Sequence, residues 1–394
     1  MFGTVHSVAW KNRIRPQPMF DILQLVQQQE LLGNDIIHLE IGDTTGFKNE
    51  SLQAYIATAV KEVPFSYSPS AGELELRKAG ADVFSADLKS DVSFEQVAVA
   101  PANALIIESI SAVTSPGDVI LIPDPGFPTY ELASTFLGLE VVRYSVFGDG
   151  IPKIESIESV REKLGRRRCA VLIVNNPSNP LGHFFSWDEY GSLIELASTS
   201  SATIVFDETY INLVFGMDNA KPLTVNSSDV IRLRSLSKEH AAPGLRIGFC
   251  MGSKQNIQTI SDFSSMVFSC LPSFVQVGAA RYLQSEASKV FTNSLNQDLR
   301  ERFAFFNKIN DQIGIVPRYI PNAGFYGFIE VQNGDRVFKN LLERFKVAVC
   351  PGSAFGLQGT NAIRVSLAGS SNDVETGLQR VVEGIQTMES EGSL

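Results

Sequence analysis

The sequence has few of the residues on which metal sites, disulfide frameworks and histidine-centred mechanisms depend. Its 394 residues include only four cysteines and four histidines. The cysteines, at positions 169, 250, 270 and 350, are far apart and form no CxxC pair. This spacing argues against a zinc site or a disulfide framework and is typical of a reducing compartment. We therefore expect no metal site.

Long hydrophobic runs and an excess of positive charge are also missing. Polar residues interrupt every apolar run before the roughly 18 residues that a membrane-spanning helix needs. The first residues have no apolar segment of the kind found in a signal peptide. The 33 Lys and Arg are outnumbered by 43 Asp and Glu, which gives a net charge of −10. Proteins that bind nucleic acid or anionic membranes usually have the opposite balance, so we expect a cytoplasmic protein with neither partner.

Several familiar active-site motifs cannot be found. The sequence contains no GxGxxG, no GxxxxGK[ST], no HExxH and no GxSxG. Only His183 and His240 lie near sequence that suggests a site. A histidine-centred, hydride-transfer or phosphoryl-transfer mechanism would therefore rest on fold class alone, which is weak support.

The middle of the chain alternates short apolar runs with helical stretches. The runs predict strands at 97–100, 119–123, 140–144, 169–174, 203–207, 230–236 and 246–251, after a first strand at 35–41. Helices are predicted at 20–32, 103–113, 130–137 and 186–198. Short, nearly all-apolar strands separated by helices indicate an α/β fold with a mostly parallel sheet between layers of helices.

The pattern of predicted helices and strands changes after about residue 272. A long helix-like stretch at 272–313 precedes strands at 325–331, 347–355 and 362–368 and helices at 335–345 and 372–388. We expect three parts on this basis. They are an N-terminal arm and helix at 1–40 that join the small domain, a large domain at 41–280, and a smaller α+β domain at 281–394.

Polar loops follow five of the predicted strands. They lie at 100–104, 124–130, 175–182, 207–210 and 235–248. The carboxyl ends of parallel strands open on one edge of a sheet, where ligands bind in α/β proteins. Five such loops in order predict one site at this edge.

The last loop is the most specific. Lys238 follows an apolar strand with Ser235 and Ser237 before it and Gly244 and Arg246 after it. This pattern resembles the lysine signature of pyridoxal-phosphate (PLP) enzymes of fold type I, the class I/II aminotransferases. The resemblance extends from about residue 41 to 368 and includes Asn179-Pro180, Asp207 with Tyr210, the loop 125–130, and Arg364.

The resemblance implies a role for each residue around the cofactor ring. Lys238 would hold the aldehyde as a Schiff base and then move protons, a task suited to a lysine whose pKa is lowered. Asp207 would keep the pyridine nitrogen protonated. Asn179 and Tyr210 would hydrogen-bond the ring's 3-oxygen, and Phe127 would stack on the ring. Tyr130, in the same loop as Phe127, stays unassigned.

The family's phosphate site implies a second group of residues. Arg246 would supply charge, Ser235 and Ser237 hydroxyls, and the helix start at Ala102 and Asn103 backbone N–H groups. Tyr67 matches the tyrosine that reaches the phosphate across the family's dimer interface, so the resemblance also implies a homodimer with active sites at the interface. The sequence departs from the family at Pro101, which has no N–H.

The substrate side is less defined. Arg364 matches the arginine that binds the α-carboxylate, a bidentate task suited to a guanidinium. Gly42 and Asn179 are assigned to the substrate with it. The loop 41–45 lacks a usual proline, and Leu181 replaces a usual threonine. Glu239 and His240 are expected at the surface. No motif identifies a distal cation, although Arg13 and Arg15 are candidates.

Three functions remain open at this point. The leading one is an aminotransferase that moves an amino group between an L-amino acid and a 2-oxo acid by a ping-pong scheme. A second is another PLP-dependent reaction in the same fold, such as β/γ-elimination, cyclisation or oxidation. A third is a cofactor-binding regulator, which would need a basic DNA-binding module that this chain does not carry.

Overall fold

The computed structural model describes residues 13–215, 229–313 and 319–392. The first twelve residues of the expected N-terminal arm lie outside these ranges. Within them, no helix is long and apolar enough to cross a membrane. The same described part of the chain contains no group of three or more His, Cys, Asp or Glu side chains that could hold a metal ion.

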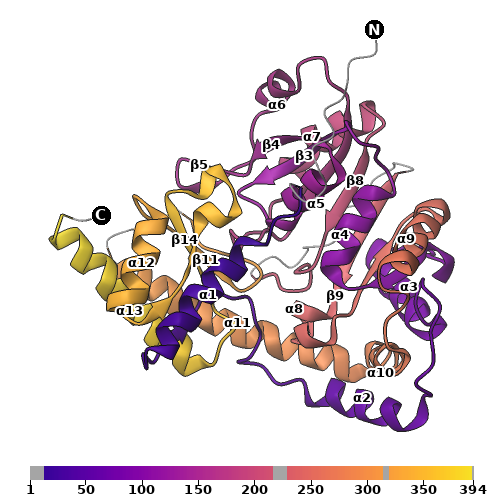
Figure 1. The fold of residues 1–394 in the computed structure, drawn as a ribbon, viewed down its shortest axis with the longest axis horizontal. Coiled ribbons are helices and arrows are strands. Elements are labelled where there is room, and N and C mark those ends of the chain that lie inside the picture. The colour runs from indigo at the N-terminus through magenta and orange to yellow at the C-terminus, as the bar shows by residue number, and fades with distance from the viewer. Residues whose placement is uncertain (1–12, 216–228, 314–318, 393–394) are drawn as a thin grey trace.

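A seven-stranded sheet lies at the centre of the molecule (Figure 1). Its neighbours are parallel except that β10 runs antiparallel to β2 and β9. This confirms the mostly parallel α/β class. In spatial order the strands are β2 (Val97–Ala100), β10 (Gly248–Met251), β9 (Val230–Ser235), β8 (Thr203–Asp207), β7 (Cys169–Asn175), β3 (Val119–Asp124) and β4 (Glu140–Ser145).

Helices cover both faces of this sheet because side chains alternate along each strand. Ile120 and Ile122 of β3 pack with α4, α5 and α9, whereas Leu121 packs with α6 and α7 on the opposite face. Helices α3 and α10 cover the end of the sheet formed by β2 and β10. Burial on two faces explains why the strands read as apolar runs. The helices are α2 (Glu50–Glu62), α3 (Leu74–Leu88), α4 (Ala102–Ser111), α5 (Thr129–Leu137), α6 (Ile157–Leu164), α7 (Trp187–Thr199), α9 (Lys254–Val267) and α10 (Ser273–Leu283).

The C-terminal elements form a second, smaller sheet with the order β11-β14-β13. The N-terminal segment lies with them, since α1 packs on α12 and β1 pairs in parallel with β12 (Figure 1). These elements are α1 (Pro18–Leu31), β1 (Ile37–His38), α11 (Glu286–Ile313), β11 (Tyr326–Glu330), α12 (Gly334–Arg344), β12 (Val347–Ala348), β13 (Cys350–Pro351), β14 (Ala362–Ser366) and α13 (Ser371–Ser390). The small strands β5 (Phe147–Gly148) and β6 (Ile151–Pro152) form a separate hairpin.

Besides the strand expected at 347–355, which is divided between β12 and β13 in different sheets, two predicted elements differ from the structure. The long helix expected at 272–313 is two helices, α10 and α11. The Ser285 hydroxyl donates to the backbone carbonyl of Tyr282 (2.7 Å), one of the carbonyls that have no partner within α10 at its C-terminal end, and so favours a break there. The strand expected at 35–41 shortens to β1, and the Glu40 carbonyl accepts instead from the Arg364 guanidinium (2.6 Å). This second difference brings the chain after β1 into the site.

His38 connects α1 to β1 through two carboxylates. Its Nδ1 lies 2.8 Å from Glu40 Oε1 and its Nε2 lies 3.1 Å from Glu30 Oε1. The hydrogen bond to Glu40 is the main reason that the pKa of His38 rises from 6.5 to about 9, against the opposing effect of burial. The charged form of His38 therefore stabilises the attachment of α1.

This pairing predicts a pH dependence of stability. Because the folded-state pKa is raised, the contribution is complete below pH 6.5 and is lost as the pH rises through about 9. Since the ring is partly exposed, we expect only about 1 kcal/mol relative to His38→Gln, measured by urea unfolding. Lys48→Gln, at an exposed ion pair, is the control and should not alter the slope between these pH values. Parallel curves for the wild type and His38→Gln would contradict the prediction.

Candidate active site

A cavity of about 280 Å3 lies at the carboxyl ends of β7, β8 and β9, with Tyr326 of β11 and Arg364 of β14 on its far wall. Its position agrees with the edge that the polar loops predict. Among the residues assigned from the sequence, all except Tyr67 line this cavity. They are Gly42, Ala102, Asn103, Phe127, Asn179, Asp207, Tyr210, Ser235, Ser237, Lys238, Arg246 and Arg364.

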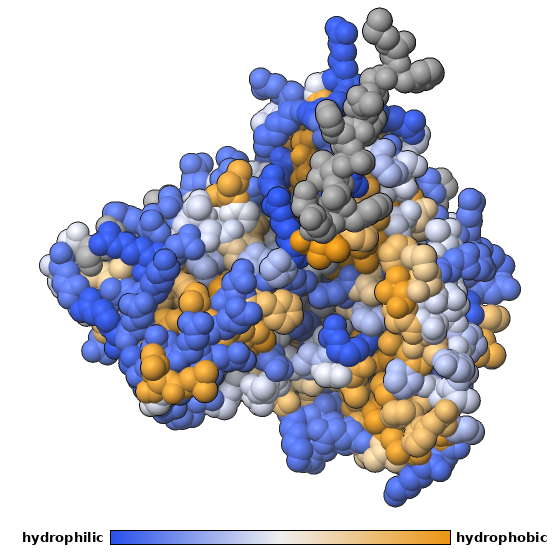
Figure 2. Space-filling model, in the orientation of Figure 1, coloured by the Kyte–Doolittle hydropathy of each residue, from blue (hydrophilic) through white to orange (hydrophobic). Residues whose placement is uncertain are grey.

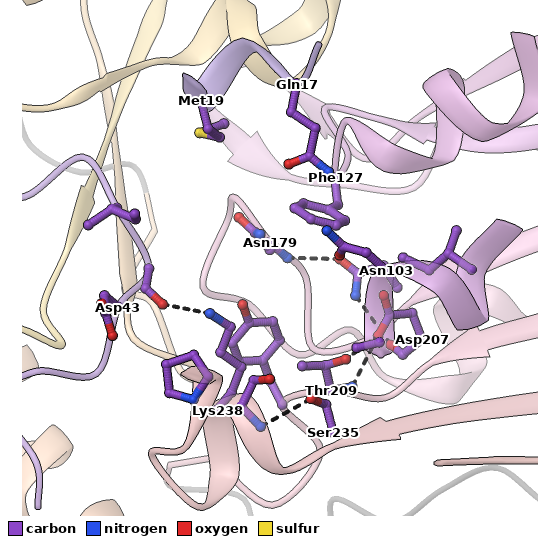
Figure 3. Close-up of a pocket in the computed structure, with 18 of the residues that line it drawn as sticks. Gln17, Met19, Asp43, Asn103, Phe127, Asn179, Asp207, Thr209, Ser235 and Lys238 are labelled. Carbon is purple, nitrogen blue, oxygen red and sulfur yellow. Dashed lines mark hydrogen bonds between the residues drawn. The ribbon is translucent and has the colours of Figure 1, made fainter. Parts of the chain in front are cut away.

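Lys238 lies on α8 (Leu236–Glu239), a single helical turn that directly follows β9. Its Nζ donates to the carbonyl of Gly42 at 2.5 Å, as Figure 3 shows. Further along the same loop, Ala241 and Arg246 have φ values of 49° and 57°. Left-handed backbone is unfavourable for residues with a Cβ and concentrates at functional sites. The loop is thus shaped to present Lys238 and Arg246 to the cavity.

Asp207 ends β8 on the opposite wall (Figure 3). The carboxylate accepts hydrogen bonds from the Tyr130 hydroxyl (2.7 Å) and the Thr209 hydroxyl (2.6 Å). Burial nevertheless raises the pKa of Asp207 above 3.8, because these bonds only partly replace the lost water. A cationic partner in the cavity would compensate for the buried negative charge.

Asn179, Tyr210 and Arg364 meet at the boundary between the two sheets. Arg364 Nη1 donates to Asn179 Oδ1 at 3.0 Å, and the Tyr210 hydroxyl lies 3.2 Å from the hydroxyl of Tyr326. Burial, with Tyr326 beside it, raises the pKa of Tyr210 well above 10.0. Tyr210 is therefore a neutral hydrogen-bonding group in this setting.

Arg364 is buried between two aromatic rings. Its guanidinium carbon lies 4.1 Å from the ring centroid of Tyr326 and 4.7 Å from that of Phe355. The arginine is only 3% exposed, and its Nε has no hydrogen-bond partner among the described residues. An unpaired buried donor is costly, and a ligand carboxylate would satisfy it.

The proposed phosphate end lies at the start of α4. Pro101 occupies the N-cap position, outside the helix, and no side chain caps the first turn. The N–H groups of Ala102 and Asn103 therefore do not depend on Pro101, and the sequence departure removes no helical donor. Ser235, Ser237 and Arg246 line the same cavity. Positive charge, hydroxyls and an uncapped helix start together suit an anion.

Tyr67 is 90% exposed and does not line the cavity of its own chain. At this exposed position its side chain is available for the role across a subunit interface that the sequence predicts. Phe127, by contrast, forms a wall of the cavity and contacts Tyr130 edge to face, with ring centroids 5.9 Å apart.

Sequence reasoning missed three side chains that shape the site. Tyr130 and Thr209 donate to Asp207, and Tyr326 contacts Gly42 so closely that a Cβ there would lie 1.9 Å from its hydroxyl oxygen. Thr209 was detectable, because a hydroxyl two residues after an Asp often bonds its carboxylate. Tyr326 was not, since only the packing of β11 against the loop after β1 brings it near.

Glu239 and His240 are buried, at 4% and 8% exposure, which corrects the expectation of surface positions. Neither lines the cavity of Lys238, and His240 Nδ1 lies 3.3 Å from the hydroxyl of Tyr282 on α10. The Glu239 carboxylate accepts from the backbone N–H (3.0 Å) and the side-chain amide (2.9 Å) of Asn212, and burial raises its pKa to about 7. Glu239 thus ties the turn of Lys238 to the turn that carries Tyr210.

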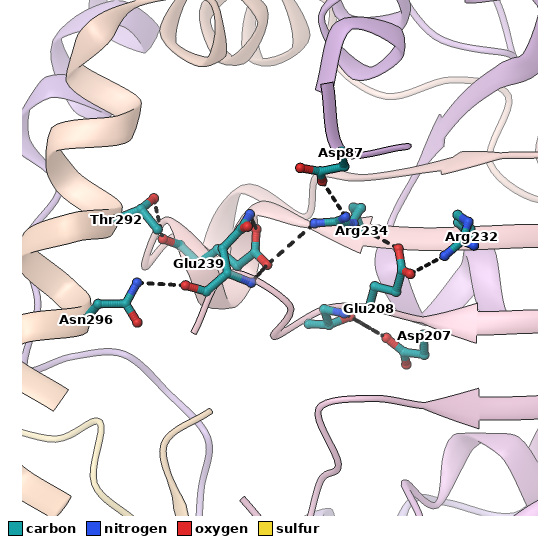
Figure 4. A network of polar contacts seen from close by, with 10 residues as sticks. Asp87, Asp207, Glu208, Arg232, Arg234, Glu239, Thr292 and Asn296 are labelled. Carbon is teal, nitrogen blue, oxygen red and sulfur yellow. Dashed lines mark hydrogen bonds and ion pairs between the residues drawn. The ribbon is translucent and has the colours of Figure 1, made fainter. Parts of the chain in front are cut away.

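A network of buried ion pairs connects Glu239 with Arg234, Glu208 and Arg232 (Figure 4). Glu208, next to Asp207, forms ion pairs with Arg232 and Arg234, and Arg234 also contacts Asp87 Oδ2 at 2.6 Å. Both arginines are 2% exposed. Two successive acids therefore serve different purposes, since Glu208 is paired inside the protein while Asp207 faces the cavity.

The fold and the site together are typical of one class of enzyme. A helix-covered, mostly parallel sheet carries a lysine, a buried aspartate and an anion site at its carboxyl edge, the arrangement of PLP-dependent enzymes of fold type I. A family model described as aminotransferase class I and II matches residues 34–381. The chain belongs to the class I and II aminotransferase family, and its activity is the transfer of an amino group.

Individual relatives agree with this assignment. The chain is 29% identical over 370 residues to (5-formylfuran-3-yl)methyl phosphate transaminase of Methanocaldococcus jannaschii, which covers 93% of this chain and 95% of the relative. It is 27% identical over 389 residues to a probable aspartate/prephenate aminotransferase of Aquifex aeolicus, with coverage of 95% and 97%. Aspartate aminotransferase from Thermus thermophilus with maleate has the same fold, with a TM-score of 0.87 at 24% identity over 95% of this chain and 98% of that one.

The burial of Asp207 predicts that its replacement lowers activity without lowering stability. Because burial raises its pKa, the ionised form costs folding free energy near neutral pH, and Asp207→Asn removes that cost. We expect the cofactor-free variant to unfold at an equal or higher temperature than the wild type. Activity should fall at least about 100-fold, because an amide cannot pair with a cation.

Thr209→Val is the matched control for this variant. It leaves the carboxylate charged and removes one donor, so it should cost about 1 kcal/mol of stability. Thermal unfolding at pH 7 measures both variants. A large loss of stability in Asp207→Asn would contradict our account of the carboxylate.

Proposed function

We propose that the chain binds PLP in the cavity of Lys238 and uses it to move an amino group between an L-amino acid and a 2-oxo acid. The donor set supports this proposal: an amine, a desolvated carboxylate, an aromatic wall and an uncapped helix start line one cavity. Lys238 would hold the cofactor, Asp207 its ring nitrogen, and Asn179 and Tyr210 its 3-oxygen. Ala102, Asn103, Ser235, Ser237 and Arg246 would hold its phosphate, and Phe127 would lie against its ring.

The cofactor supplies an aldehyde that binds amines and a ring that draws electrons from the donor's α carbon. The protein supplies the rest. Arg364 binds the α-carboxylate of the donor, with Asn179 and Gly42 beside it, and so fixes the orientation of the α carbon. Lys238 Nζ would take up the α-proton of the donor and return it.

The single observation that carries the proposal is that Lys238 and the buried Asp207 line the same cavity. No feature of the described residues specifically favours elimination, cyclisation or oxidation, and the relatives are named aminotransferases. The acidic balance of the chain likewise does not favour a DNA-binding regulator.

Lys238→Ala tests the proposed attachment. The wild type should be yellow as purified, and its visible absorbance should fall when an amino donor is added and return with a 2-oxo acid. Lys238→Ala should show neither change in a full cycle, because the amine that carries the α-proton is gone. The release of ammonia, or continued turnover without a 2-oxo acid, would favour another PLP reaction.

We also propose that the active unit is a homodimer. Phe65 (79% exposed), Tyr67 (90%), Met266 (75%) and Val267 (58%) form an exposed apolar patch. The two segments lie together, since the rings of Phe65 and Phe274 are 5.4 Å apart and the Ser68 hydroxyl donates to the Leu271 carbonyl. Hydrophobic side chains gather on this side of the molecule, around α2, α9 and α10 (Figure 2). Such a patch marks an interface, and it would carry Tyr67 toward the partner's phosphate site.

Charged substitutions in the patch test the dimer. Phe65→Glu with Met266→Glu should convert the protein to a monomer in light scattering, because two carboxylates would be buried at the interface. Cofactor affinity should fall at least about 10-fold with the loss of the partner's tyrosine. Leu357→Glu, which is equally exposed at 72% but distant in the chain, should leave both unchanged. A double variant that remains a dimer would contradict the assignment of this interface.

We also propose a division into domains and a cellular location. The separate sheets support a large domain at 41–280 and a small domain at 281–394 that the segment 1–40 joins. The four cysteines are free thiols, which supports a reducing, cytoplasmic location.

A further inference from the structure

The start of α1 forms the roof of the active-site cavity. Met19, Phe20 and Leu23 line it, and their spacing places them on one face of the helix. Ile22 and Val26, on the adjacent face, are buried and hold α1 against the C-terminal elements. The side chain of Gln17 donates to the Thr129 hydroxyl at 2.7 Å and so spans the cavity to α5. Figure 3 shows Gln17 and Met19 on this side, opposite Lys238.

The apolar side chains of the roof are incompletely covered. Phe20 is 58% exposed, and Ile41, which lines the cavity just after β1, is 38% exposed. Exposed apolar surface that gathers at a cavity marks a place where an apolar ligand group is bound. Ile22 and Val26 account for the packing of this helix together with Met19, whose sulfur lies 3.5 Å from Cys350 Sγ. Phe20 and Leu23 are therefore the roof residues of α1 that are most available for a ligand.

The described residues of this chain leave no cation in the cavity for a second carboxylate. Among the described residues, its cations are Lys238, Arg246 and Arg364, and each already has a partner in the proposed function. The candidates for a distal cation are elsewhere. Arg13 lies against Gly138 at the end of α5, and Arg15 is exposed and outside the lining.

Asp43 adds a negative charge to the lining of the cavity. It lines the cavity next to Gly42, and no described residue forms a hydrogen bond or ion pair with its carboxylate. A carboxylate on the side chain of a bound amino acid would meet this group without a compensating cation. Repulsion from Asp43 therefore disfavours acidic donors, while the roof favours apolar ones.

We propose that the roof formed by Met19, Phe20, Leu23 and Ile41 is the side-chain subsite of the enzyme and selects amino acids with a large, uncharged apolar side chain, aromatic or aliphatic. This inference rests on the proposed function, because it assumes that Arg364 holds the α-carboxylate. It assigns to the N-terminal helix a role in specificity that the sequence signatures of the lysine, aspartate and arginine do not contain.

Binding of unreactive carboxylates to the PLP-loaded enzyme tests the subsite without turnover. 3-Phenylpropionate and 4-methylpentanoate carry the expected side chains, and succinate carries a second carboxylate instead. By isothermal titration calorimetry we expect the two apolar acids to bind at least about 10-fold more tightly than succinate. Equal or tighter binding of succinate would overturn the inference, for instance through a cation from a partner subunit.

Variants of α1 identify the surface responsible. Phe20→Ala with Leu23→Ala should weaken 3-phenylpropionate at least about 5-fold and leave succinate unchanged. Leu25→Ala, on the same helix at 42% exposure but outside the lining, is the matched control. Asp43→Asn should improve succinate binding several-fold, because it removes the repulsive charge. Equal losses for both ligands in the α1 variant, or no loss, would overturn the assignment of the roof.

Single-donor reactions separate the two proposals. With phenylalanine, leucine, methionine, alanine, aspartate and glutamate supplied one at a time, the rate of the absorbance change should be highest for the large apolar donors, at least about 100-fold above the acidic ones. Preference for aspartate or glutamate would overturn the subsite and leave the aminotransferase intact. If no donor reacts while 3-phenylpropionate still binds more tightly than succinate, the proposed function fails and the subsite stands.

Discussion

The site depends on one carboxylate that is almost completely buried. Asp207 lies at the end of a central strand, with β7 and β9 on either side and helices over both faces. Hydrogen bonds from Tyr130 and Thr209 compensate in part for burial, yet its pKa still rises. A folded protein keeps such a group when the group has a task, because an uncharged residue would be less costly. The remaining compensation is available from a cation bound in the cavity.

The buried charge of Glu208, the next residue, is compensated within the protein itself. Glu208 is buried as deeply, but Arg232 and Arg234 pair with it inside the protein. Through Arg234 and Glu239, this internal network extends beneath the turn of Lys238, and Glu239 reaches the turn of Tyr210 by way of Asn212. The two turns therefore rest on a network of buried ion pairs in which only Arg234 Nη1, 3.9 Å from Glu239 Oε1, has no hydrogen-bond partner among the described residues, and this network limits how far Lys238 and Tyr210 can move apart.

The net charge of −10 conceals a local arrangement of the opposite sign. Lys238, Arg246 and Arg364 come from distant parts of the chain and face one cavity. Arg364 is presented by the smaller sheet and is connected to the larger one through Asn179. The α-carboxylate subsite that we propose would thus lie where the two sheets meet. The N-terminal helix covers this boundary, which explains why residues so early in the chain contact the same space as the lysine.

Much of this arrangement could be predicted from the sequence. The strands of the central sheet were predictable because burial on both faces makes each a short apolar run, and the polar loops after them located the site. Lys238, Asp207, Asn179 and Arg364, which line one cavity, could be selected from the sequence because each belongs to a local motif. Tyr326, the roof of α1 and the burial of Glu239 and His240 were not, because they depend on contacts between segments far apart in the chain. Local chemistry can be read from neighbouring residues. The shape of the cavity, the pairing of buried charges and the surface that meets the substrate's side chain were decided only when packing brought distant segments together.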